Sequence, residues 1–282
     1  MTFVVAVIAP GAMGAAVGKR LVRRGASVLT SLAGRSRATA ARASEAGMTA
    51  ASDEEIAAAD FVLSILPPGD ALPLAQRFAP VLQTSNAKPV YVDCNAINPA
   101  TVERVAAAIA PTGCAFVDAG IIGAPPRDDD AGPRFYASGA AAPRFAALRQ
   151  YGLDVRVLDG ALSAASALKM SYAGITKGTQ AIGAAMMLAA VRAGSADALF
   201  DELSFSQKEM LAQFKHQLPM MPAKAYRWVA EMQEIAGFVG DDPAANELYQ
   251  GAAHFYRRIA EDFAADKKAV AALKAFLTKA SP

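Results

Sequence analysis

The chain is 282 residues long, with 54% hydrophobic and 19% charged residues and a formal net charge of +2. This length suffices for one large or two ordinary domains, and the composition is that of a compact folded protein rather than a disordered one. The small net charge gives no reason to expect nucleic acid or an anionic membrane as a partner. The apolar stretch 181–191 falls well short of the ~20 residues needed to cross a bilayer.

Short apolar runs alternate with amphipathic stretches up to about residue 160. Runs without polar alternation, separated by helical segments such as 14–24 and 36–46, are typical of a parallel sheet covered on both faces. The six expected strands are Phe3–Ile8, Ser27–Leu32, Phe61–Leu66, Val90–Cys94, Ala115–Ala119 and Asp154–Leu158. Residues 1–161 are therefore predicted to form an α/β Rossmann-type, doubly wound domain.

The strand signal stops after residue 160, and long alanine-rich stretches with a helical period follow. The expected helices are Ser163–Ala193, Ser195–Gln217, Ala223–Gly237 and Pro243–Ala280. The chain should thus be an α/β domain followed by an all-α domain over residues 162–282, with the boundary near Leu162.

The first expected strand runs into the turn APGAMG, residues 9–14. In a dinucleotide-binding turn, a first glycine permits the tight turn, a second lets the backbone approach the pyrophosphate, and a third lets helix and strand pack closely. Gly11 and Gly14 fall in the second and third places, while Ala9 replaces the first. Helix capping alone can also give such a pattern, but the strands on either side favour a working nucleotide-binding turn. The amides available to phosphate are those of Ala12, Met13 and Gly14.

The end of the second expected strand lacks the acidic residue that usually bonds the ribose 2′-hydroxyl of NAD. The chain has Leu32 there, followed shortly by Arg35, Ser36 and Arg37. Two guanidinium groups and a hydroxyl can hold a 2′-phosphate by charge-assisted hydrogen bonds. The alternative is a solvated start to the next helix. We expect NADP as cofactor, with NAD possible.

Five segments, taken in chain order, resemble motifs of one superfamily. They are APGAMG (9–14), DFVLSILPP (60–68), VYVDCNAINPATV (90–102), FVDAGIIGAPP (116–126) and ASALKMSYAGITKG (165–178). The superfamily is that of the β-hydroxyacid dehydrogenases, which includes 3-hydroxyisobutyrate dehydrogenase and 6-phosphogluconate dehydrogenase. The helical part is closer to a less characterised subgroup, through a stretch like YRWVAEMQEIA (226–236). The resemblance implies an oxidoreductase that transfers a hydride between NADP(H) and a small hydroxy acid or carbonyl compound.

The resemblance also implies roles for particular residues. Lys169 matches the family's catalytic lysine. Leu66 and Pro67 fall in the loop that passes under the cofactor, and Asn95 falls in a further cofactor-binding segment.

The expected substrate contacts depart from the family's pattern. Ile122 and Gly123 lie in the substrate loop, but Ile122 stands where the family has serine. Tyr172 and Ala173 stand where asparagines commonly follow the lysine. We expect Tyr172 and Thr176 to contact the substrate, whose identity these departures leave open.

Lys169 lies in an apolar helical stretch, which suits a proton-transfer role. Cys and His form no zinc-binding set and no metal site is expected, so a side chain must move the proton. Burial lowers the pKa of a lysine towards neutrality. At 100° per residue, Tyr172, Thr176 and Gln180 lie within roughly 60° of the Lys169 face, and Lys177, about 80° away, should face solvent or a domain edge. The alternative is a lysine that merely reaches the surface.

Two other functions remain open. One is an imine or ketone reductase on the same fold, although imine reductases usually lack the lysine. The other is a catalytically silent nucleotide-binding sensor.

Assembly and location follow from two further features. Residues 181–191 are apolar on nearly every side, so other helices must cover them. The resemblance implies that a second subunit supplies part of this cover, and we expect a homodimer built largely from residues after 160. Cys94 and Cys114 have no metal-ligand spacing and suit a reducing cytoplasm. The other expected partner is a small-molecule substrate.

Overall fold

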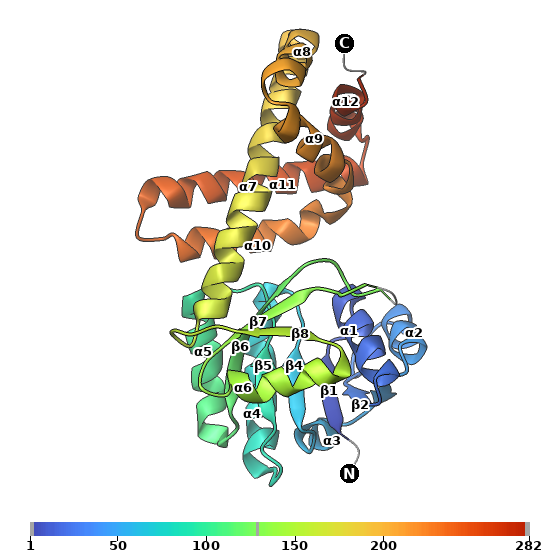
Figure 1. Ribbon diagram of the computed structural model, residues 1–282, viewed down its shortest axis with the longest axis vertical. Coiled ribbons are helices and arrows are strands. Elements are labelled where there is room, and N and C mark those ends of the chain that lie inside the picture. The colour runs from blue at the N-terminus through green and yellow to red at the C-terminus, as the bar shows by residue number, and fades with distance from the viewer. Residues whose placement is uncertain (1–2, 128–129, 280–282) are drawn as a thin grey trace. The chain divides into compact units, whose positions relative to one another are not determined.

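A computed structural model describes residues 3–127 and 130–279 (Figure 1). Residues 1–2 of the first predicted domain and 280–282 of the second lie outside these ranges. The chain divides into two compact units, 1–170 and 171–282. Among the residues so described, the first unit holds a sheet with flanking helices and the second holds helices alone, which confirms the predicted fold class. Helix α7 (Ala164–Ala193) runs across the division, so the domain boundary near Leu162 stays a prediction.

An eight-stranded sheet forms the first unit, in the order β3-β2-β1-β4-β5-β6-β7-β8. Every neighbouring pair is parallel except β6 and β7, which are antiparallel. The strands are β1 Val4–Ile8, β2 Ser27–Thr30, β3 Thr49–Ala50, β4 Phe61–Ser64, β5 Val90–Asp93, β6 Phe116–Ile122, β7 Arg134–Ser138 and β8 Asp154–Val157. All six predicted strands are present, whereas β3 and β7 were not predicted.

Helices cover both faces of this sheet (Figure 1). Val5 and Val7 of β1 belong to one hydrophobic core and Ala6 and Ile8 to the other, because successive strand side chains point to opposite faces. The first core includes α1 (Ala12–Arg23), α2 (Arg37–Glu45) and α6 (Ala142–Phe145), and the second includes α3 (Asp53–Ala57), α4 (Ala71–Thr84) and α5 (Pro99–Ile109). Short 3-10 turns lie at Pro68–Asp70, Ala110–Thr112 and Ala146–Tyr151.

The second unit consists of the remainder of α7 and five further helices. They are α8 Ala196–Ser206, α9 Lys208–Gln217, α10 Ala225–Phe238, α11 Pro243–Ala264 and α12 Lys268–Leu277, with 3-10 turns at Leu218–Met220 and Pro222–Lys224. The prediction of single helices over 195–217 and 243–280 was wrong. The first breaks at Gln207, and the second breaks where Lys267 takes a left-handed φ of 56° and Asp262 caps the amides of α12. Ala280 lies outside the described residues. Across the two described ranges, no helix is long and apolar enough to span a membrane.

Lys177 corrects a further expectation. Its side chain is only 16% exposed and forms an ion pair with Glu231 of α10. The Lys177 ammonium lies 5.1 Å from the centre of the Trp228 ring, and the Tyr256 hydroxyl donates to the Lys177 carbonyl at 2.6 Å. Because α10 and α11 lie side by side (Figure 1), this lysine faces them rather than solvent.

Candidate active site

The strand order has a switch point between β1 and β4, from which the sheet is built outwards in both directions. Open α/β sheets bind ligands outside the carboxyl ends of their strands at such a point. The turn 9–11 leaves the carboxyl end of β1 here and leads directly into helix α1. The sheet topology therefore puts the candidate dinucleotide turn at the expected position.

The two glycines of this turn have different surroundings. A Cβ atom added at Gly14 would lie 2.1 Å from the Ala9 carbonyl oxygen, so only glycine lets α1 come this close to the end of β1. A Cβ atom added at Gly11 would meet nothing within 4 Å. Gly11 is also the N-cap of α1, whose first-turn amides have no acceptors within the helix. Open space beside free amide groups fits the pyrophosphate of a dinucleotide. Ala12 is exposed and Met13 half-buried in that first turn.

The predicted 2′-phosphate site lies at the start of helix α2. Arg35 and Arg37 are exposed. The Ser36 hydroxyl accepts a hydrogen bond from the Thr39 amide at 3.3 Å, so it already caps the helix. Arg42, which the sequence did not single out, reaches back from α2 and donates to the Pro10 carbonyl at 3.4 Å. This contact ties the last turn of α2 to the glycine turn.

A row of polar residues crosses four neighbouring strands. Ser64, Asp93, Asp118 and Ser138 are partners in the register of β4, β5, β6 and β7, and each is fully buried. Burial raises the pKa of Asp93 to about 7, with a further rise from the Asp118 charge. Burial raises the pKa of Asp118 to about 6, although hydrogen bonds from Ser166 and Ser138 act in the opposite direction. The sheet thus holds two carboxyl groups that are costly to ionise.

Asn95 joins this row to the loop after β4. Its side-chain oxygen accepts from the Leu66 amide at 2.5 Å, and its side-chain nitrogen donates to Ser64 Oγ at 2.7 Å and Asp93 Oδ2 at 2.9 Å. Asn95 is 2% exposed. Its side chain therefore fixes the loop that carries Leu66 and Pro67, while its contact with a cofactor stays a prediction. Leu66 is half-buried and Pro67 exposed.

Asp118 anchors the beginning of helix α7. Its carboxylate accepts from the Ser166 hydroxyl at 2.6 Å and from the Ser166 amide at 2.8 Å. The Ser138 hydroxyl donates to the Leu162 carbonyl at 2.7 Å and accepts from the Ala165 amide at 2.9 Å. Two adjacent strands therefore hold the first turn of the helix that carries Lys169.

Gly120 lies beneath Lys169. A Cβ atom added at Gly120 would lie 3.0 Å from the Lys169 Cβ and 2.9 Å from the Ala165 carbonyl oxygen. The helix therefore approaches β6 as closely as a glycine allows, and the half-buried Lys169 side chain starts directly above the strand. Asp118, Gly120 and Ser166 fall within two of the family-like segments, 116–126 and 165–178, but were not among the predicted site residues.

The predicted substrate residues fall in both units. Ile122 ends β6 and is half-buried, and Gly123 follows with a φ of 133° that favours glycine. Tyr172 and Thr176 lie on α7 in the second unit. Tyr172 is 49% exposed, and the Thr176 hydroxyl donates to the Tyr172 carbonyl at 2.8 Å. Lys169, Ile122 and Gly123 thus belong to the first unit, and Tyr172 and Thr176 to the second.

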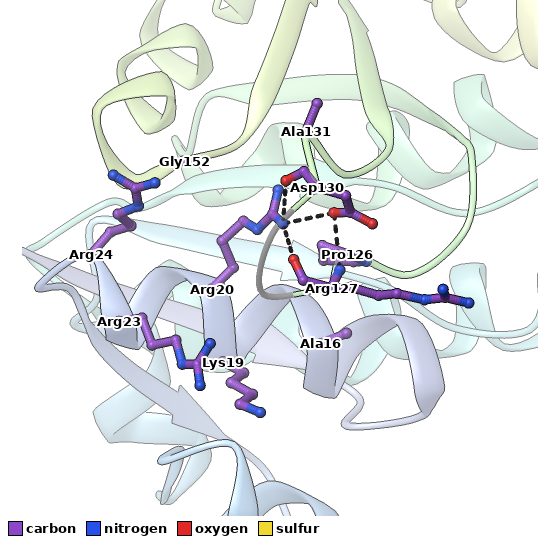
Figure 2. A pocket seen from close by; sticks show the side chains of 10 residues that line it. All are labelled: Ala16, Lys19, Arg20, Arg23, Arg24, Pro126, Arg127, Asp130, Ala131 and Gly152. Atoms are coloured by element: carbon purple, nitrogen blue, oxygen red, sulfur yellow. Dashed lines mark hydrogen bonds and ion pairs between the residues drawn. The ribbon is translucent and has the colours of Figure 1, made fainter.

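A cavity of about 510 Å³ lies elsewhere, beside helix α1 (Figure 2). Arg20 turns there toward the loop after Gly123, donating to the carbonyls of Arg127 and Asp130 at 2.5 and 2.9 Å and pairing with the Asp130 carboxylate at 2.9 Å. In Figure 2, Lys19, Arg23 and Arg24 point away from this contact. The cavity contains none of the predicted site residues. Arg20 therefore fixes the β6–β7 loop rather than marking the site.

The geometry of the first unit agrees with its sequence match. Residues 4–150 match the NAD binding domain of 6-phosphogluconate dehydrogenase. The chain belongs to this family. Residues 190–259, which include α8 to α10 and most of α11, match a domain of unknown function, DUF1932. The NAD binding domain thus contains the glycine turn, the polar row and Gly120.

Solved structures extend the similarity beyond the NAD binding domain. A conserved protein of unknown function, MTH1747, described as structurally similar to 3-hydroxyacid dehydrogenases, is 29% identical with a TM-score of 0.70, over 96% of this chain and 99% of its own. The 3-hydroxyisobutyrate dehydrogenase of Mycobacterium tuberculosis, solved with L-serine, is 23% identical with a TM-score of 0.69, over 98% and 99%. An imine reductase of Myxococcus stipitatus, solved with NADP+, is 16% identical with a TM-score of 0.56, over 99% and 100%. No curated protein matches significantly. The expected β-hydroxyacid dehydrogenase-like family and fold are confirmed.

Proposed function

We propose that this protein is an oxidoreductase that transfers a hydride between NADP(H) and a small hydroxy acid or carbonyl compound, with Lys169 as general acid/base. One observation carries the proposal. Lys169 sits on a helix turn held against β6, in the same sheet whose β1 end bears a turn fitted to a dinucleotide. A dinucleotide turn and a lysine on a firmly held helix turn of the same domain would supply the two requirements of carbonyl reduction.

The chain's own residues divide the remaining tasks. The bound nicotinamide cofactor supplies or accepts the hydride. The first-turn amides of α1 hold the pyrophosphate, and the loop of Leu66 and Pro67, fixed by Asn95, supports the rest of the cofactor. In reduction the Lys169 ammonium donates a proton to the carbonyl oxygen. In oxidation its amine accepts the hydroxyl proton.

NADP is the proposed cofactor, rather than NAD. The exposed Arg35 and Arg37 flank the start of α2, and no carboxylate follows β2 to repel a phosphate. The Ser36 hydroxyl is already the helix cap, so the guanidinium groups and the first-turn amides of α2 are the contacts that remain for a 2′-phosphate.

The substrate contacts we propose are Ile122 and Gly123 of the NAD binding domain, with Tyr172 and Thr176 further along α7. Ile122 offers a hydrocarbon surface where the family commonly has serine. This favours a second candidate function, the reduction of ketones or imines that carry no carboxylate. Lys169 favours the first candidate.

We also propose a homodimer formed by the helices after residue 160. Ile175, Ile182 and Met186 recur at helical spacing on α7 and are 69%, 53% and 58% exposed, and Leu248 of α11 is 52% exposed. An apolar surface of this kind is typical of an interface between subunits. Light scattering should give the mass of a dimer, and a monomeric mass at micromolar concentration would contradict the proposal. The buried free thiols of Cys94 and Cys114 support a cytoplasmic location.

The function is tested by oxidation of NADPH in the presence of four compounds. Glyoxylate and pyruvate carry a carboxylate, propionaldehyde does not, and 2-methyl-1-pyrroline is a cyclic imine. Reduction of the two acids supports the first candidate, and reduction of the aldehyde or imine alone supports the second. NADPH binding without turnover of any related carbonyl or imine would indicate a silent sensor.

A further inference from the structure

We propose that Asp118 is a positioning residue for Lys169, acting through Ser166 of helix α7. The inference rests on the proposed function, in which Lys169 transfers the proton. It adds the group that determines where the Lys169 side chain begins.

The Asp118 carboxylate accepts two hydrogen bonds from one residue, Ser166. One oxygen accepts from the Ser166 hydroxyl at 2.6 Å and the other accepts from the Ser166 amide at 2.8 Å. Two bonds to one residue of a helix fix both its rotation and its height along the axis. Because residues three apart share a helix face, this fixes Lys169 as well.

Gly120 adds an independent constraint from the same strand. Its missing side chain lets the Lys169 Cβ and the Ala165 carbonyl come within 3.0 and 2.9 Å of the place a Cβ would occupy. Asp118 thus sets the rotation of the turn, and Gly120, two residues along β6 on the same face, sets its distance from the sheet. Together, Asp118 and Gly120 determine the position of the Lys169 backbone relative to the sheet.

The composition of this contact favours positioning over stability. Asp118 and Ser166 are fully buried, and the bonds to Asp118 come from the hydroxyl and the amide of Ser166 rather than from a cation. A buried carboxylate costs folding free energy, whereas apolar packing would attach an alanine-rich helix without that cost. A fully satisfied buried network does fix one geometry.

Three variants test the inference, with NADPH and whichever of the four carbonyl and imine compounds wild type reduces fastest. Ser166→Ala removes the hydroxyl, Asp118→Asn replaces one acceptor oxygen, and Gly120→Ala pushes the helix outwards. Each should lower kcat about 10- to 100-fold, since displacement of about 1 Å costs that much in a positioned reaction, and should leave KM and the Kd for NADPH within about threefold. Two controls should match wild type. Ser204→Ala removes a buried hydroxyl that has no hydrogen-bond partner in the described part of the chain, and Gly251→Ala adds a methyl with nothing within 4 Å.

Combination with Lys169→Ala separates positioning from general damage. If Ser166 acts through Lys169, then Ser166→Ala should lower the residual rate of Lys169→Ala no further, whereas a general effect would multiply. Labelling of Lys169 by acetic anhydride, followed by mass spectrometry, should also be faster in Ser166→Ala because the turn is looser.

The possible failures are distinct. Full activity in Lys169→Ala would overturn the proposed function itself. An inactive Lys169→Ala beside a Ser166→Ala and an Asp118→Asn with wild-type kcat would overturn only the positioning of Lys169. Loss of folding in all three variants would overturn it too, since the contact would then serve stability.

Discussion

Alanine substitutions at the two glycines of the dinucleotide turn should separate cofactor binding from folding. At Gly14 the new Cβ would lie 2.1 Å from the Ala9 carbonyl oxygen, whereas real contacts of this kind stay above 3.0 Å. The strand end or the helix start must therefore move by about 1 Å, and overpacking of this kind costs about 1–3 kcal/mol. At Gly11 the new methyl meets nothing within 4 Å, and its φ of −70° suits alanine. Gly11→Ala should therefore keep the free energy of unfolding within about 1 kcal/mol of wild type.

Gly11→Ala, which should hardly change stability, should weaken the binding of NADPH. Its methyl would occupy the open space that we assign to the pyrophosphate, and the loss of one charge-assisted hydrogen bond costs about 1.5–3 kcal/mol, or about 10- to 150-fold in Kd. Urea denaturation measures stability, and quenching or enhancement of NADPH fluorescence measures binding. A Gly11→Ala protein that binds NADPH as wild type does would refute the placement of the pyrophosphate. A Gly14→Ala protein as stable as wild type would refute the close approach of α1.

Three further predictions concern selectivity, pH and an ion pair. NADPH should bind at least about tenfold tighter than NADH, and Arg35→Ala should remove most of the difference; equal dissociation constants in wild type would count against NADP. The folded-state pKa of Asp93, about 7, lies above its ordinary value of 3.8. The stability contributed by the protonated carboxyl is therefore fully present below about pH 3.8 and is lost as the pH rises from there through 7. The free energy of unfolding should thus fall by up to about 4 kcal/mol between about pH 4 and pH 8, less so in Asp93→Asn, and an identical urea-denaturation profile in the variant would contradict this. Glu231→Ala should cost about 3 kcal/mol in urea denaturation by leaving the Lys177 charge buried, while Lys177→Met with Glu231→Leu should restore most of it; equal losses in the single and double variants would show that the charge is not the cause.

Most of the sheet could be predicted because its strands are buried on both faces and so appear as continuous apolar runs. Strand β7 was not predicted from the sequence because it begins with the charged Arg134, at the edge of the antiparallel pair, and follows Gly132 and Pro133. The break between α11 and α12 was not predicted for another reason. The apolar period continues through it, and only the Asp262 cap and the left-handed Lys267 end one helix and begin the next.

In the candidate site, too, residues in local motifs could be predicted, whereas contacts between residues far apart in the sequence could not. Gly11, Gly14 and Lys169 could be named because their places in short motifs have a local meaning. Asp118 and Ser166 are 48 residues apart, and no local pattern indicates that one accepts two hydrogen bonds from the other. Periodicity alone likewise placed Lys177 towards solvent, because its partner Glu231 lies 54 residues away on α10.

Proton transfer by Lys169 is tested most directly by a single-turnover measurement. Enzyme loaded with NADPH is mixed with the best of the four carbonyl and imine compounds, and the decay of NADPH absorbance gives the rate of the chemical step. Lys169→Ala should slow that step about 10²- to 10⁴-fold, the range for loss of a general acid, while the Kd for NADPH stays within a few-fold of wild type. Lys268→Ala, which removes an exposed ammonium from α12, should change neither value. A Lys169→Ala rate within a few-fold of wild type would contradict the claim.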